Sequence, residues 1–330
     1  MTDKQVGLRI DGLSVSANVE GQRVRIVDEV SITLGPGTIV GVAGESGSGK
    51  TVTAMAAMQL LKGTGLRIDR GSICLDDDEL VGLSERELRK YRGVRVSMVF
   101  QEPMTSLDPC FRVGELLVET LRSHQRISAS DAKRRAVDLL ERVGIPDPAK
   151  RFRSYPFQMS GGQLQRVLIA MAIANSPSVL IADEPTTALD VTVQAQILDL
   201  IKALAATGMA VMLVTHDLAL MSEYTQQLTV MYAGQVVETG PTDVVLANPS
   251  HPYTSGLVAS IPSVHRRGEL QSIPGRIPLP TEDVQGCRFA ARCPFVEEKC
   301  AVPIPLEPVA SDRAVRCIRH AELDLEGYAR

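Results

Sequence analysis

The sequence predicts an α/β fold with a largely parallel β-sheet that helices cover on both faces. Short, largely apolar runs at residues 178–182 and 210–214 are typical of buried strands. Each run is followed by a stretch with helical periodicity, at residues 193–204 and 218–224. Because consecutive parallel strands need a crossover connection, which is usually a helix, this alternation predicts parallel strands.

The chain's 330 residues exceed one ordinary domain, so we expect one large domain and a smaller one. The net charge is −4. Nucleic acids are bound largely through their phosphates by basic surfaces, so we expect no nucleic-acid partner. No apolar segment approaches the length of a membrane span, and the N-terminus lacks an apolar signal region. We therefore expect the protein to stay in the cytoplasm.

The first forty residues alternate apolar and polar side chains, which predicts antiparallel strands at the start of the chain. A turn at residues 35–37 closes this part. The apolar run at residues 38–43 then predicts a buried strand, and residues 52–61 predict a helix.

Between this strand and this helix, residues 44–51 fit the pattern G-x-x-x-x-G-K-[ST] at every fixed position. Glycines let consecutive backbone N–H groups face anionic phosphates, and the helix N-terminus adds partial positive charge there. Lys50 should reach the β- and γ-phosphates of a nucleotide, and the Thr51 hydroxyl should bind Mg²⁺. The predicted nucleotide-binding residues are Gly44, Glu45, Ser46, Gly47, Ser48, Gly49, Lys50, Thr51 and Val52.

The middle of the chain predicts strands at residues 72–75 and 95–100 and helices at 84–91, over the long helical period 113–143, and at 163–175. The strand at residues 178–182 ends in the paired carboxylates Asp183 and Glu184. In a phosphate-loop protein, Asp183 would hold Mg²⁺ opposite Thr51. Glu184 would be placed to polarise an attacking water as general base.

Further motifs resemble those of the ATP-binding cassette (ABC) ATPases of membrane transporters. Gln101 follows a strand as in the family's Q-loop, and Thr215-His216-Asp217 resembles its switch histidine. The family's signature motif has its counterpart in the run Ser160, Gly161, Gly162 and Gln163. Its D-loop resembles Ala188, Leu189 and Asp190. The resemblance covers about residues 8 to 240. It implies an ABC-type P-loop ATPase with a RecA-like core, an antiparallel β-subdomain and a helical subdomain at about residues 102–172.

The resemblance also implies roles for these residues. Two cassettes dock head to tail, so that Ser160, Gly161, Gly162 and Gln163 of each cassette cover the ATP held by the other. His216 contacts the γ-phosphate, and the Asp190 loop links the two sites. The catalytic residues would be Glu184, His216 and Gln101, and the Mg²⁺ ligands would be Thr51, Gln101 and Asp183.

One departure from the family concerns the nucleotide base. Many members stack adenine on an aromatic side chain upstream of the phosphate loop, but this chain has no Phe, Tyr or Trp before Tyr91. The planar guanidinium of Arg23 or Arg25 could stack on the base instead.

The composition changes after residue 248, where turn residues and prolines become frequent. We therefore predict an ABC nucleotide-binding domain at residues 1–248 and a small, loop-rich extension at residues 249–330. Strings at residues 100–109, 181–192 and 248–254 resemble the oligopeptide/dipeptide/nickel importer subfamily.

The subfamily resemblance implies the ATP-hydrolysing subunit of a peptide importer at the cytoplasmic face of the inner membrane. Its partners would be two permease subunits, an extracytoplasmic substrate-binding protein and a second cassette, commonly a different subunit. Nickel or another small solute is the alternative cargo. A homodimer of this cassette is the alternative to a pair of different cassettes. Three rival functions are less favoured. The C-terminal extension argues against an exporter, and the presence of a single cassette argues against a soluble ABC protein. The presence of Glu184 and His216 argues against a cassette that binds ATP but cannot cleave it.

Four of the six cysteines share the extension with the spacing C-x5-C-x6-C-x16-C: Cys287, Cys293, Cys300 and Cys317. In a cytoplasmic protein such a group suggests a metal site more than disulfides. Thiolates can hold Zn²⁺ or an iron–sulfur cluster. Paired C-x2-C knuckles, the usual zinc signature, are absent, and the subfamily resemblance points to a [4Fe–4S] cluster in some members. Iron–sulfur is therefore favoured, with zinc and unliganded thiols as alternatives.

Overall fold

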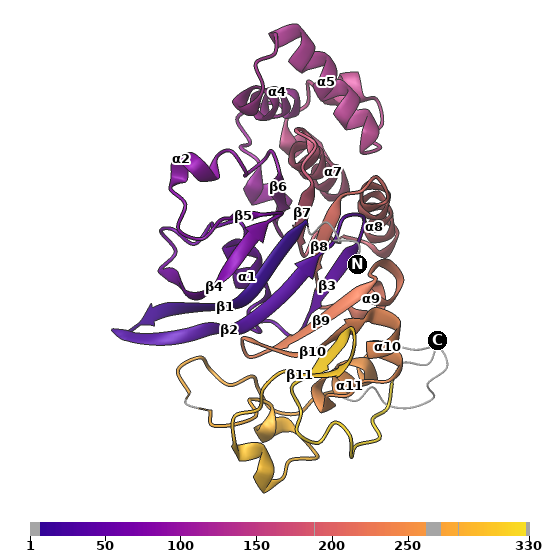
Figure 1. The fold of residues 1–330 in the computed structure, drawn as a ribbon. Helices are drawn as coiled ribbons and strands as arrows, with labels where there is room; N and C mark the ends of the chain where they lie inside the picture. The colour runs from indigo at the N-terminus through magenta and orange to yellow at the C-terminus, as the bar shows by residue number, and fades with distance from the viewer. Residues whose placement is uncertain (1–6, 188, 262–271, 283, 328–330) are drawn as a thin grey trace. The chain divides into compact units, whose positions relative to one another are not determined.

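The computed structural model describes residues 7–187, 189–261, 272–282 and 284–327 (Figure 1). These residues form two compact units. The first unit holds Gly35–Thr38 and Gly82–Met212, and the second holds Leu8–Leu34, Ile39–Val81 and the chain from Leu213 onward. The predicted boundary at residues 248 and 249 falls inside the second unit, and it stays a prediction.

The second unit begins with an antiparallel sheet in the order β2-β1-β4-β5. Its strands are β1 (Leu8–Val19), β2 (Gln22–Leu34), β4 (Leu66–Leu75) and β5 (Asp78–Glu79). The turn between β1 and β2 places Glu20 and Gly21 at φ 51° and 80°. Two residues at positive φ are the mark of a tight hairpin turn whose twist matches the strands. The antiparallel strands predicted for the start of the chain are therefore present.

A second set of strands in this unit includes β3, which leads into the phosphate loop. Its order is β3-β9-β10-β12-β11, with β3 parallel to β9 and the later pairs antiparallel. The strands are β3 (Ile39–Ala43), β9 (Gln227–Tyr232), β10 (Gln235–Pro241), β11 (Glu307–Ala310) and β12 (Arg313–Val315). All five residues of β3 are buried, as expected for a strand that is covered on both faces.

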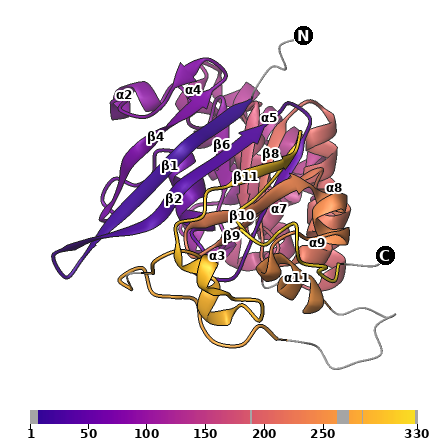
Figure 2. The same ribbon diagram turned by 60° about the horizontal axis from the view of Figure 1, so that its bottom comes forward.

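Helices and short turns complete the second unit: α1 (Lys50–Ala57), α9 (Leu218–Tyr224), α10 (Thr242–Ala247), α11 (Pro252–Ala259), η2 (Ala290–Arg292) and η3 (Glu298–Ala301). Helix α1 ends earlier than predicted, because Gln59 takes a positive φ of 54° that a right-handed helix does not allow. The C-terminal extension is not loop alone, since β12 pairs with β10; Figure 2 shows a strand of the extension alongside β10.

The first unit contains the parallel strands β6 (Val96–Val99) and β7 (Val179–Asp183), with β8 (Ala210–Val214) next to β7 in the strand order. Its helices are α2 (Glu85–Leu88), α3 (Pro103–Ser106), α4 (Val113–His124), α5 (Ala129–Arg142), α6 (Pro148–Arg151), η1 (Pro156–Gln158), α7 (Gly161–Ile173) and α8 (Val191–Ala206).

The single helical period predicted over residues 113–143 is broken into α4 and α5. Ser128 starts a new helix by accepting a hydrogen bond from the Asp131 backbone N–H at 3.1 Å. Among the residues that the structure describes, no helix has the length and apolar character needed to cross a bilayer.

Candidate functional site

The phosphate loop connects β3 to α1, as the sequence predicts. Gly44 has a φ of 146°, and a Cβ there would lie 2.2 Å from the Met231 carbonyl oxygen. Only glycine can therefore occupy the first position of the loop. Gly49, at φ 100°, precedes the first residue of α1 and brings no side chain to the helix start. The loop thus meets the helix N-terminus in the arrangement that binds phosphate.

Lys50 folds back over this loop and is only 5% exposed. Its Nζ donates to the Gly44 and Glu45 carbonyl oxygens at 2.7 and 2.9 Å. The two carbonyl oxygens compensate the buried ammonium for its loss of hydration. Phosphate oxygens are stronger acceptors than these carbonyls, so the lysine is placed to bind them.

In the first unit, the paired carboxylates follow β7. Asp183 is the last residue of the strand and is 2% exposed. Glu184 takes a left-handed backbone, with φ 47°, which costs a non-glycine residue about 1–2 kcal/mol. Its Oε2 accepts hydrogen bonds from Gln101 Nε2 at 2.8 Å and from Thr187 Oγ1 at 2.9 Å. The structure therefore brings together two of the three predicted catalytic residues, Gln101 and Glu184.

The signature residues form the start of α7. Ser160 Oγ accepts from the Gln163 backbone N–H at 3.4 Å, and the Gln163 side chain accepts from the Ser160 N–H at 3.2 Å. This reciprocal capping explains the serine and the glutamine without any ligand. Ser160 and Gly161 are exposed. A Cβ on Gly162 would lie 2.5 Å from Val193 Cγ1 of α8, a packing constraint that the motif alone does not reveal.

The D-loop and switch residues occupy helix starts. Asp190 caps α8 by accepting from the Val193 N–H at 3.0 Å. Ala188 lies outside the described residues. His216 is exposed in the turn between β8 and α9, and the next residue, Asp217, caps α9. A role for His216 at the γ-phosphate stays a prediction.

Comparison with known proteins decides the family. Residues 27–187 match the family model described as ABC transporter. A putative peptide import ATP-binding protein of Brucella abortus (strain 2308) is 46% identical over 312 residues, which cover 94% of each chain. This chain belongs to the ABC transporter family. The resemblance inferred from the motifs is thereby confirmed.

Other comparisons extend the ABC assignment along the chain. A putative peptide import ATP-binding protein of Brucella ovis is 45% identical over 335 residues, covering 97% of this chain and 99% of the relative. Residues 237–300 match the model described as Oligopeptide/dipeptide transporter, C-terminal region. The predicted oligopeptide-transporter-type extension is therefore supported by a family model of its own.

Solved structures confirm the predicted α/β fold class. The ATP-binding cassette MJ0796, solved as a dimer in a post-hydrolysis state bound to ADP and Pi, has a TM-score of 0.64 at 26% identity. The match covers 71% of this chain and 98% of that one. The cassette cbiO1 from Clostridium perfringens has a TM-score of 0.62 at 23% identity, covering 74% and 91% of the two chains.

A cavity of about 290 Å³ in this ABC chain adjoins the phosphate loop at Gly47. Arg23 and Arg25 of β2 line it, together with Leu279 and Pro280 of the extension. Arg25 also binds Asp28 at 2.8 Å, and Arg23 binds Asp69. Both arginines that the sequence suggested as partners for the base thus border a space next to the loop. Stacking on adenine stays a prediction.

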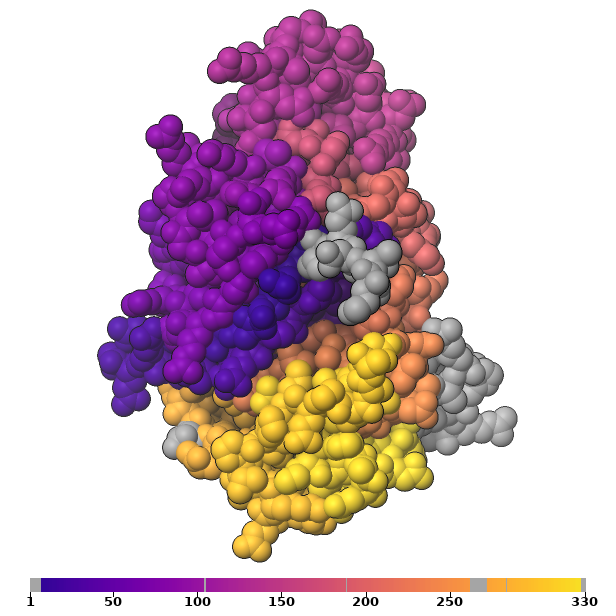
Figure 3. Space-filling view, in the orientation of Figure 1, coloured from indigo at the N-terminus to yellow at the C-terminus, as the bar shows by residue number. Residues whose placement is uncertain are grey.

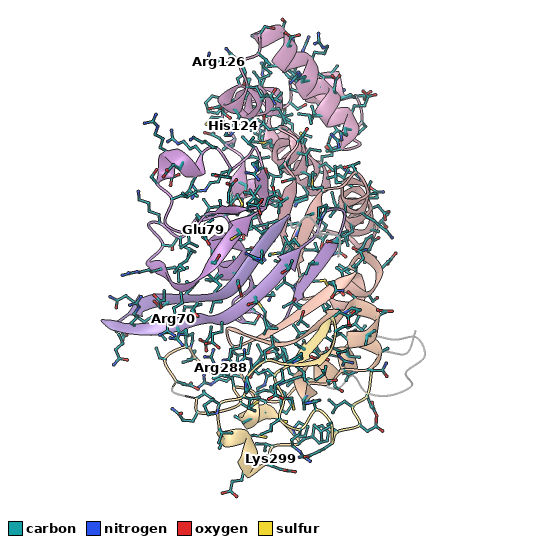
Figure 4. The ribbon with its side chains drawn as sticks, in the orientation of Figure 1. Arg70, Glu79, His124, Arg126, Arg288 and Lys299 are labelled. Atoms are coloured by element: carbon teal, nitrogen blue, oxygen red, sulfur yellow. The ribbon has the colours of Figure 1, made fainter. Side chains whose placement is uncertain are left out.

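Arg288 anchors the extension beside this cavity. Its Nη2 bonds Asp28 Oδ2 at 2.6 Å, and its Nη1 donates to the Ala233 carbonyl oxygen at 2.5 Å. Figure 4 shows Arg288 on the side of the extension that faces β2, whereas Lys299 lies at the far end. The ion pair with Asp28 therefore joins the extension to the antiparallel sheet.

The four extension cysteines line one cavity, together with Phe289 and His251. Burial raises the pKa of the Cys287, Cys293 and Cys317 thiols above the ordinary value. Within the described residues, no group of three or more His, Cys, Asp or Glu is arranged to hold a metal ion. The described arrangement thus supports neither the iron–sulfur cluster nor zinc, and both stay predictions.

The contacts of Glu45 with the extension could not be expected from the sequence. The motif allows any residue at this position of the loop, so no pattern marks it. In the structure, its carboxylate binds Arg292 and its backbone N–H donates to the Tyr253 hydroxyl.

Proposed function

We propose that this chain is the ATP-hydrolysing subunit of an ABC importer for peptides. It couples ATP binding and hydrolysis, at the interface of a cassette dimer, to substrate movement through membrane permease subunits. The observation that carries this proposal is the likeness, over nearly the full length of the chain, to relatives named as peptide import ATP-binding proteins. The match of residues 237–300 to the oligopeptide/dipeptide transporter model supports it.

The site residues then have defined tasks. Lys50 and the glycines of the loop bind the phosphates, and Glu184 accepts the proton of the attacking water. Gln101 donates to the Glu184 carboxylate at 2.8 Å and so fixes its direction. Carboxylate, hydroxyl and amide oxygens are ligands that Mg²⁺ prefers, and Asp183 offers a buried carboxylate at a strand end. Mg²⁺ held by Thr51, Gln101 and Asp183 would neutralise charge on the phosphates.

A second cassette completes each site, and we propose that it is a different subunit. The start of α7 supports docking of a second cassette, whether identical or different, because Ser160 and Gly161 are exposed at a helix N-terminus, where the partner's ATP can reach them. Two permeases and an extracytoplasmic substrate-binding protein complete the importer. The chain is then peripheral at the cytoplasmic face of the inner membrane.

Transport by the assembled importer tests the proposed function. The chain, purified with its permeases and partner cassette and placed in liposomes with the binding protein, is expected to take up a labelled oligopeptide only when MgATP is present. The measurement is uptake with ATP compared with uptake with ADP. Accumulation of Ni²⁺ with no peptide uptake would establish the nickel alternative instead. ATP hydrolysis by a chain that binds no permease would indicate a soluble ABC protein.

We further propose that Cys287, Cys293, Cys300 and Cys317 hold a [4Fe–4S] cluster that braces the extension. Protein purified without oxygen is expected to carry about four iron and four sulfide per chain and to absorb at about 400 nm. Cys300→Ser should lose this content, whereas Cys110→Ser, at an exposed cysteine outside the cavity, should keep it. One zinc per chain, or neither iron nor zinc, would refute the cluster.

A further inference from the structure

Arg292 of the extension binds the phosphate loop directly. Its side chain is 5% exposed. Nη1 donates to Glu45 Oε2 at 2.9 Å and Nη2 donates to Glu45 Oε1 at 3.1 Å. This two-pronged pairing fixes the direction of the carboxylate as well as its distance. The second residue of the phosphate loop is thus held by a residue that lies 247 positions further along the chain.

The guanidinium itself cannot swing freely. Its Nε donates to the Pro274 carbonyl oxygen at 2.8 Å, and Nη2 donates also to the Ile273 carbonyl oxygen at 3.1 Å. Its Cζ stands 5.7 and 6.0 Å from the ring centres of Tyr232 and Phe289. Hydrogen bonds to backbone oxygens and contacts with aromatic rings together hold the planar guanidinium in one orientation.

A second contact from the same region holds the backbone of Glu45. Its N–H donates to the Tyr253 hydroxyl at 2.9 Å. Tyr253 is fully buried, with ring centres of Tyr232 and Phe289 at 4.6 and 5.4 Å. The side chain and the backbone of Glu45 are thus both fixed by residues outside the loop.

Glu45 passes this restraint to Lys50. Its carbonyl oxygen accepts from Lys50 Nζ at 2.9 Å, next to the Gly44 carbonyl at 2.7 Å. The Glu45 N–H shares one planar peptide unit with the Gly44 carbonyl, so the Tyr253 contact restrains the carbonyl oxygen that accepts from Lys50 Nζ. The position of the phosphate-binding ammonium therefore depends on contacts that originate in the extension. Figure 3 shows the C-terminal part of the extension as a yellow surface.

We propose that Arg292 is a positioning residue for ATP binding, which acts through Glu45 to keep the phosphate loop in its binding shape. The proposal rests on the proposed function, because it takes the loop to bind ATP. A buried ion pair is weak evidence for stability, since desolvation offsets much of the attraction. Positioning of the phosphate loop explains the Arg292–Glu45 ion pair better than a contribution to stability does.

The experiment measures equilibrium binding of MgATP and MgADP to the full chain and to the variants Arg292→Gln, Arg292→Lys, Glu45→Gln and the Arg292→Gln/Glu45→Gln double variant. Arg292→Gln should weaken MgATP binding on the order of tenfold to a hundredfold, as misplaced binding groups do. Arg292→Lys should regain part of the loss, because it keeps the charge but not the fork. The double variant should lose little more than either single variant, since the two residues act as one unit.

Arg313→Gln is the matched control. Arg313 forms a buried ion pair with Glu238 at 2.7 Å and likewise joins the extension to β10, but its recorded partners Glu238, Asn248 and Ser250 lie outside the phosphate loop. The Arg313→Gln variant should have a lower thermal unfolding midpoint than the wild-type chain and an unchanged affinity for MgATP. If Arg292→Gln and Arg292→Lys also changed only the midpoint, Arg292 would be an anchor of the extension and the proposal would be wrong. Failure of the wild-type chain to bind MgATP would refute the proposed function itself.

Discussion

The Glu184→Gln variant is expected to bind MgATP with near wild-type affinity and to hydrolyse it about 10²- to 10⁴-fold more slowly, the usual contribution of a general base. An amide has the shape of the carboxylate but cannot take up the proton of the attacking water. Its oxygen can still accept from Gln101 Nε2 and Thr187 Oγ1, the partners of Glu184 Oε2. Single-turnover release of phosphate from ATP by the assembled cassettes measures this loss.

Glu119→Gln provides the same chemical change on the exposed surface of α4 and should leave turnover unchanged. A Glu184→Gln protein that releases phosphate at the wild-type rate would show that Glu184 is not the base. Slow release together with weak ATP binding would point to a damaged site instead. The variant is therefore informative only when binding and turnover are measured on the same preparation.

The Lys50→Ala variant should lose nearly all tight nucleotide binding. Hydrogen bonds to charged groups contribute about 1.5–3 kcal/mol. Their removal weakens MgATP binding by roughly tenfold to 150-fold. The true loss should lie toward the upper end, because Lys50 also spans the loop between the Gly44 and Glu45 carbonyl oxygens. Isothermal titration with MgATP measures the change in affinity.

Lys62→Ala removes an exposed lysine that follows α1 in the chain, and it should bind MgATP normally. Equal affinity for Lys50→Ala and wild-type protein would refute the phosphate-loop assignment. Comparison of Lys50→Ala with Lys62→Ala separates the role of the Lys50 ammonium from a general effect of losing one positive charge. Such a general charge effect would be screened by salt.

The parts of the site that depend on neighbours in sequence could be predicted. The phosphate loop occupies eight consecutive residues, and the capping of α7 joins Ser160 to Gln163 three positions later. Such local relations are visible as spacing. The break between α4 and α5 was missed because the apolar period continues through it, while a single polar cap at Ser128 restarts the helix.

Long-range relations could not be predicted in this way. Nothing in the sequence links Glu45 to Arg292 or Tyr253, since each residue alone is an ordinary charged or aromatic side chain. The strands of the extension were missed for a related reason. β11 and β12 are four and three residues long, too short for an alternating pattern, and the pairing of β12 with β10 is fixed by tertiary structure.

The two glycines of the signature differ in a way that affects how substitutions there can be interpreted. Gly162 lies where any side chain would collide with Val193, so alanine at this position would force α7 and α8 apart. A lost activity would then report misfolding as readily as a lost phosphate contact. Gly161 has its nearest neighbour, Leu189 Cδ2, at 3.4 Å from an added Cβ, which is ordinary contact. Gly161 is therefore the position at which the signature can be altered while the helix pair beneath it keeps its packing.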